Sequence, residues 1–168
     1  MARPSRALID ALRATAERLR GDVAYRWTHM GACNCGHLAQ TVTELPREAL
    51  HAMATERPGD WSELARDHCG ASGLPIDHVI ATMLDIGLSR SDIRELERLE
   101  GREVLRRLPA GERTLDHRRK ADVVRYLETW ADLLEEAHAG SDAARREAEV
   151  VATLAAAGQA RAVEEAMG

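Results

Sequence analysis

Aromatic residues and lysine are scarce in this chain of 168 residues, which has no phenylalanine, two tyrosines, three tryptophans and a single lysine, Lys120. Without phenylalanine, the volume of the core must come from leucine, valine, isoleucine, methionine and alanine, which suit helix packing. The almost exclusive use of arginine as the basic residue is typical of bacteria with GC-rich genomes. The composition therefore favours a helical core in a bacterial protein.

Long apolar runs are also missing. No stretch approaches the roughly 20 apolar residues that cross a bilayer, and the first five residues lead into a charged amphipathic pattern without the apolar region of a signal peptide. The formal net charge of −5 removes any overall attraction to nucleic acid or to anionic lipid. We therefore expect a cytoplasmic protein that binds neither duplex nucleic acid nor a membrane.

The alternation of apolar and polar residues that marks a β-strand does not occur over any useful length. Apolar residues make up 45% of the chain and charged residues 30%, which is a globular balance. Apolar stripes at helical spacing predict helices at about 4–20, from 37 onward, 46–53, 60–70, 75–87, 89–101, 104–108 and 116–138. We predict an all-α fold, a single compact multi-helix bundle with an ordered Cys/His loop after the first helix.

The last part of the chain is rich in alanine. We predict a helical domain over 1–139, followed over 140–168 by an Ala-rich C-terminal helix or a loosely docked tail. Alanine favours helix but offers little bulk to bury, so this segment is either loosely docked, an oligomer contact, or frayed. A homo-oligomer or a protein partner would accordingly be bound through the C-terminal helices.

Only the segment from His29 to His37 has a residue pattern that indicates a chemical function. It contains Cys33-x-Cys35-x-His37, and Cys69 follows His68 further along the chain. An odd cysteine count without an export signal favours metal ligands or reduced thiols over disulfides. Thiolate and imidazole are preferred zinc ligands, and alternate residues of an extended stretch point to one side.

The predicted metal ligands are Cys33, Cys35, His37 and Cys69, with His29 or His68 as alternatives to His37. Zinc is the expected metal, and an iron-sulfur cluster is the alternative cofactor. The competing interpretation is that the cysteines are inert buried thiols, since cysteine often packs as a small hydrophobic residue.

A second interpretation starts from Tyr25 and Trp27, followed by Asn34-Cys35-Gly36. This pattern resembles the start of the catalytic segment of NlpC/P60 cysteine peptidases, in which a helix N-terminus favours the thiolate of the nucleophile. The resemblance implies Cys35 as the nucleophile of a thiol-dependent enzyme. The two glycines expected after the tryptophan are missing here. The family's general-base histidine lies on a β-strand, whereas the nearest downstream candidate, His78, lies in a predicted helix.

Residues 83–93 resemble a helix-turn-helix DNA-binding motif, because a glycine turn joins two helical segments. Arg90, Arg94 and Arg98 lie four residues apart on the second helix, but aspartate and glutamate share it and would repel phosphate. The sequence favours two packed helices with a charged, solvated face. Three functions thus stay open: metal binding for a structural or sensing role, thiol-dependent catalysis with Cys35 or Cys33 as the nucleophile, and a helical protein–protein interaction module.

Overall fold

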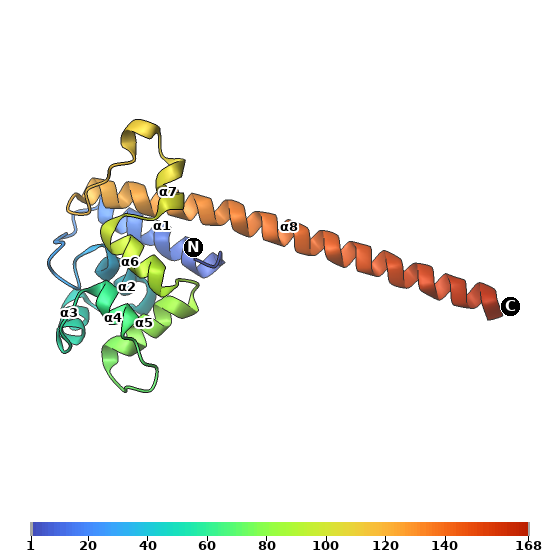
Figure 1. Cartoon of the computed structure of the whole chain (residues 1–168), viewed down its shortest axis with the longest axis horizontal. Coiled ribbons are helices and arrows are strands. Elements are labelled where there is room, and N and C mark those ends of the chain that lie inside the picture. The colour runs from blue at the N-terminus through green and yellow to red at the C-terminus, as the bar shows by residue number, and fades with distance from the viewer. Residues whose placement is uncertain (1, 168) are drawn as a thin grey trace. The chain divides into compact units, whose positions relative to one another are not determined.

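The computed structural model describes the backbone of residues 2–167 and the side chains of residues 2–142, 145, 146 and 149. Over this part of the chain the fold is all-helical and contains no strand, which confirms the predicted fold class (Figure 1). The α-helices are α1 (Arg6–Arg20), α2 (Asn34–Thr43), α3 (Arg47–Thr55), α4 (Trp61–Arg66), α5 (Pro75–Asp85), α6 (Arg90–Arg98), α7 (Arg102–Arg107) and α8 (Lys120–Met167). A short 3-10 helix, Ala110–Glu112, precedes α8.

The chain divides into two units. The first, Met1–Glu135, contains α1 to α7 and the beginning of α8, and the second, Glu136–Gly168, continues α8 as a single helix to Met167. The predicted domain boundary at 139/140 stays a prediction. The predicted partner contact of the C-terminal helices falls mainly on side chains outside the described residues, and it too stays a prediction.

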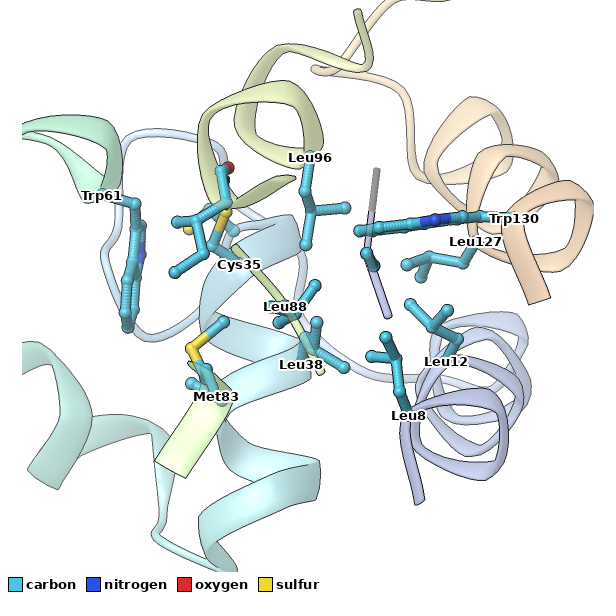
Figure 2. Close-up of a cluster of buried hydrophobic side chains, with 14 of the residues drawn as sticks. Leu8, Leu12, Cys35, Leu38, Trp61, Met83, Leu88, Leu96, Leu127 and Trp130 are labelled. Carbon is cyan, nitrogen blue, oxygen red and sulfur yellow. Dashed lines mark hydrogen bonds between the residues drawn. The ribbon is translucent and has the colours of Figure 1, made fainter. Parts of the chain in front are cut away.

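The apolar stripes expected from the sequence form the core of the first unit. On α5, Ile76, Val79, Ile80 and Met83 are all buried, as the periodicity predicts. Figure 2 shows how this core combines side chains from distant segments, with Leu8, Leu38, Met83, Leu96 and Leu127 coming from five different helices. No helix in the described part of the chain is long and apolar enough to cross a bilayer.

α2 is the central helix of this unit, because it packs against α1, α3, α5 and α6. Its first six residues, Asn34 to Ala39, are all buried. The segment that the sequence marks as chemically unusual therefore lies in the middle of the protein. This position decides how its cysteine and histidine side chains behave.

Side-chain caps mark the start of α1, α2, α4 and α6. The capping box predicted for α4 is present, with Asp60 accepting from the Glu63 amide and the Glu63 carboxylate accepting from the Asp60 amide. Ser89 caps α6 as predicted. The start of α2 differs from the prediction, because this helix begins at Asn34 and not near His37.

Candidate functional site

Cys33 is the N-cap residue of α2, and backbone groups fix its thiol. Sγ accepts a hydrogen bond from the Gly36 amide at 3.4 Å and donates to the Met30 carbonyl at 3.5 Å. Burial raises the pKa of the Cys33 thiol to about 12, because the thiolate would lose its hydration. Cys33 thus takes the capping role that serine usually has, as a neutral thiol.

Cys35, two residues further along α2, is completely buried. Its Sγ donates to the Ile93 carbonyl of α6 at 3.6 Å, and Figure 2 shows it among the core side chains between Trp61 and Leu96. Burial raises the pKa of this thiol well above its ordinary value. Cys35 therefore lacks the exposure and the lowered pKa that the resemblance to cysteine peptidases would require of a nucleophile.

His37 is also buried, with 3% of its surface exposed. Its Nε2 lies 3.2 Å from the Ala24 carbonyl oxygen, which can only accept, so this nitrogen carries the proton. Nδ1 is buried and finds no hydrogen-bond partner among the described residues. Burial lowers the pKa of His37 to about 4 in spite of the opposing bond to Ala24, so the ring is neutral at pH 7.

The low pKa of His37 predicts a loss of stability in mild acid. The unfolded chain takes up a proton on this residue near pH 6.5 and the folded chain only near pH 4. Its contribution is complete above pH 6.5, and about 3 kcal/mol is lost as the pH falls to 4. Urea unfolding should show this extra loss in the wild type but not in His37→Gln, which keeps a donor for Ala24. Parallel pH profiles for the two proteins would contradict the assignment.

The helical start of α2 explains why the predicted metal ligands do not converge. The metal hypothesis placed Cys33, Cys35 and His37 on one side of an extended stretch, but two residues along a helix correspond to a rotation of about 200°. Cys33 and His37 do share a face, yet both side chains are hydrogen-bonded to backbone groups. Cys69 lines a separate surface cavity whose lining includes none of the other three.

Within the described residues, no group of three or more His, Cys, Asp or Glu side chains is arranged to hold a metal ion. The four predicted ligands therefore gain no support from the geometry, and neither does His29 or His68 as a replacement for His37. Zinc or an iron-sulfur cluster stays a prediction that metal analysis can test.

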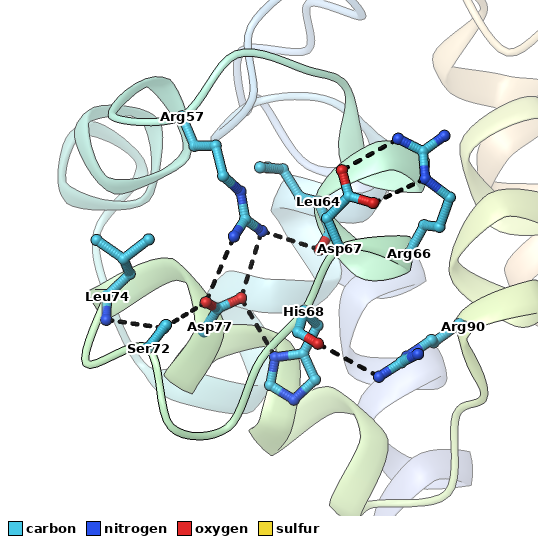
Figure 3. Close-up of polar contacts among 9 residues, drawn as sticks. All are labelled: Arg57, Leu64, Arg66, Asp67, His68, Ser72, Leu74, Asp77 and Arg90. Atoms are coloured by element: carbon cyan, nitrogen blue, oxygen red, sulfur yellow. Dashed lines mark hydrogen bonds and ion pairs between the residues drawn. The ribbon is translucent and has the colours of Figure 1, made fainter.

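A buried carboxylate organises the loop that carries Cys69 (Figure 3). Asp77, on the first turn of α5, is 3% exposed and accepts hydrogen bonds from the Ser72 hydroxyl at 2.5 Å, the Arg57 guanidinium at 3.3 Å and His68 Nδ1 at 3.3 Å. Burial alone would raise the pKa of Asp77, but the bonds from Ser72 and His68 and the charge of Arg57 outweigh it and hold the pKa low. Asp77 is therefore an ionised anchor for this loop.

The loop holds Cys69 at the surface, in contrast to the other two thiols. The Ser72 amide donates to the Cys69 carbonyl at 3.1 Å, which closes a turn over 69–72. Cys69 lines a cavity of about 280 Å³ together with Ser72, Leu74, Asp77 and His78. Leu74 is the only large hydrophobic side chain among the described residues that is exposed, at 36%. An exposed thiol, an exposed leucine and a histidine thus share one cavity.

Two buried polar residues that matter for this architecture were not anticipated from the sequence. The Asn34 side-chain amide donates to the carbonyls of Leu96 at 2.7 Å and Glu97 at 3.0 Å, so it caps the end of α6. The Glu97 carboxylate accepts from the backbone amides of Trp61 and Ser62 at 3.1 Å each, at the start of α4. Neither role follows from local spacing, because the partners are far apart in sequence.

The described geometry separates the predicted residues into a buried group, Cys33, Cys35 and His37, and an exposed thiol, Cys69. The first group connects α2 to its neighbours, and the second lies at a surface cavity. Comparisons of this chain with protein-family models, with curated proteins and with solved structures found no match.

Proposed function

We propose that this protein acts through thiol chemistry at Cys69, which forms a reversible covalent bond with a disulfide-bearing ligand in a sensing role. The observation that carries the proposal is that Cys69 alone among the three thiols is exposed, and that it lines a cavity with Leu74 and His78. A thiol must reach solvent to react, and Cys33 and Cys35 do not.

The residues around the cavity suit such a reaction. The first turn of α5 contributes Pro75, Asp77 and His78 to the lining. The negative charge of Asp77 is offset by Arg57, whose guanidinium lies 3.3 Å from it. His78 is exposed on this turn and lines the same cavity as the Cys69 thiol.

The reaction balances without a further oxidant. The Cys69 thiolate attacks one sulfur of the ligand disulfide, a new S–S bond forms, and the other half of the ligand leaves as a thiolate that takes up a proton. Cys33 and Cys35 are buried and cannot attack the mixed disulfide. The product therefore persists until an external thiol reduces it, which is the behaviour of a sensor.

Leu74 defines the class of ligand. Its exposed side chain offers apolar contact in the cavity, so the folded protein should accelerate the reaction of an apolar aryl disulfide more than that of a charged one such as cystine, each compared with a reference thiol outside the cavity. The reference rate is that of a synthetic peptide spanning residues 65–74, which has the same thiol without the folded cavity.

The experiment measures the rate of mixed-disulfide formation with dipyridyl disulfide by intact mass spectrometry at pH 7. We expect one adduct per chain, located on Cys69, formed severalfold faster than on the peptide. Leu74→Ser and His78→Ala should each bring the rate toward that of the peptide, whereas the neighbouring exposed change Ala71→Ser should leave it unchanged. Equal rates for protein, variants and peptide would show that the cavity contributes nothing and would overturn the proposal.

A further inference from the structure

A second surface cavity, formed by the loop before α2 and the start of α3, is lined by basic side chains. It has a volume of about 310 Å³, and Arg26, His29 and Arg47 line it together with Tyr25. The His29 ring stacks on that of His51, with 3.8 Å between their centroids. Three basic side chains thus line one cavity, and the ring of His51 packs on one of them.

The backbone holds these groups in place. The loop is closed by hydrogen bonds from the Arg26 amide to the Ala32 carbonyl at 3.0 Å and from the His29 amide to the Arg26 carbonyl at 3.1 Å. Gly31 packs directly on the start of α3, since a Cβ there would lie 2.0 Å from the Arg47 carbonyl oxygen. This contact fixes Arg47 beside the loop that carries Arg26 and His29.

The positive charge is only partly balanced. Glu48 pairs with Arg47 at 2.5 Å, but the Glu48 side chain is 70% exposed, so water screens the pair. Arg26 has no ion-pair partner among the described residues. Burial lowers the pKa of His29, and the positive charges of His51, Arg47 and Arg26 lower it further. An anion in the cavity would relieve this repulsion.

We infer that this cavity binds a phosphate group, inorganic or as a phosphomonoester. Arginine guanidinium groups bind phosphate oxygens through paired, charge-assisted hydrogen bonds, and two arginines line the cavity. His29 adds a third donor to the cavity lining. Its Nδ1 accepts from the Gly31 amide at 3.2 Å, so Nε2 carries the proton and is the donor that remains.

The test is a titration of the full-length protein with inorganic phosphate at pH 7 and constant ionic strength, followed by calorimetry and by the imidazole NMR signals of His29 and His51. We expect saturable binding that shifts both signals. Arg26→Gln and Arg47→Gln should each weaken it about tenfold, while Arg66→Gln, an exposed arginine paired with Asp67, should have no effect.

Phosphoserine and glycerol phosphate, compared with inorganic phosphate, distinguish a phosphomonoester from the free ion as the preferred ligand. The Arg26 side chain is exposed and that of Arg47 is half-buried, with 41% of its surface exposed, so circular dichroism should show an unchanged fold for both variants. Absence of saturable phosphate binding, or equal weakening by Arg66→Gln, would overturn the inference.

Discussion

Replacement of Gly36 by alanine is expected to lower the free energy of unfolding by about 3 kcal/mol, which corresponds to a melting temperature lower by about 10 °C. A Cβ at this position would lie 2.2 Å from the Met30 carbonyl oxygen and 2.7 Å from the Gly31 carbonyl carbon. Both are backbone atoms that cannot rotate away. The loop before α2 would have to move, and with it the hydrogen bond from the Gly36 amide to Cys33.

The sign of this effect is informative, because Gly36 lies within a helix, where alanine normally stabilises by about 1 kcal/mol. Gly70→Ala is the matched control, since a Cβ there would meet no heavy atom within 4 Å. Thermal unfolding followed by circular dichroism compares the two variants. A Gly36→Ala protein as stable as the wild type would show that the loop does not pack on α2 as described.

The second large effect is expected for Asn34→Asp, which should destabilise the protein by about 4 kcal/mol at pH 7. The side-chain amide of Asn34 donates to the carbonyls of Leu96 and Glu97, and the residue is completely buried. An ionised carboxylate of the same shape would face two carbonyl oxygens with no proton to donate.

Asn34→Ala separates the loss of hydrogen bonds from charge repulsion. It leaves the two carbonyls without these bonds but adds no charge, so we expect about 2 kcal/mol. Gln40→Ala is the control, because Gln40 donates a single bond, to the Gly31 carbonyl at 2.7 Å, from a half-buried position. In urea unfolding, the loss of stability should be largest for Asn34→Asp, smaller for Asn34→Ala and smallest for Gln40→Ala. Equal stability of Asn34→Asp and Asn34→Ala would contradict the assigned donor role.

The sequence is a good guide to the helices whose caps and stripes are local. The stripe on α5 and the capping box of α4 involve residues three or four positions apart, and both are confirmed. The start of α2 cannot be predicted from cap preferences, because its N-cap residue is Cys33 and cysteine is not among the preferred N-cap residues. From the sequence alone, a cysteine that caps a helix cannot be distinguished from any other cysteine.

The candidate site was harder to predict for a related reason. The Cys33-x-Cys35-x-His37 spacing suits a metal loop only if the chain is extended, and the structure makes it the first turn of a central helix. The cavity at Cys69 depends on Asp77, which collects Arg57, His68 and Ser72 from 5 to 20 residues away. Such a convergence is set by tertiary packing and leaves no local pattern.

The central claim is that Cys69 is the reactive thiol and that Cys33 and Cys35 are structural. Alkylation of the native, reduced protein with iodoacetamide, followed by peptide mass spectrometry, tests it most directly. We predict that Cys69 is modified at the rate of an exposed thiol, while Cys33 and Cys35 react at least about a thousandfold more slowly because they must wait for unfolding. Rapid modification of Cys33 or Cys35 would contradict the claim. Protection of all three thiols would also contradict it, and if a chelator abolished that protection, the result would favour the metal site.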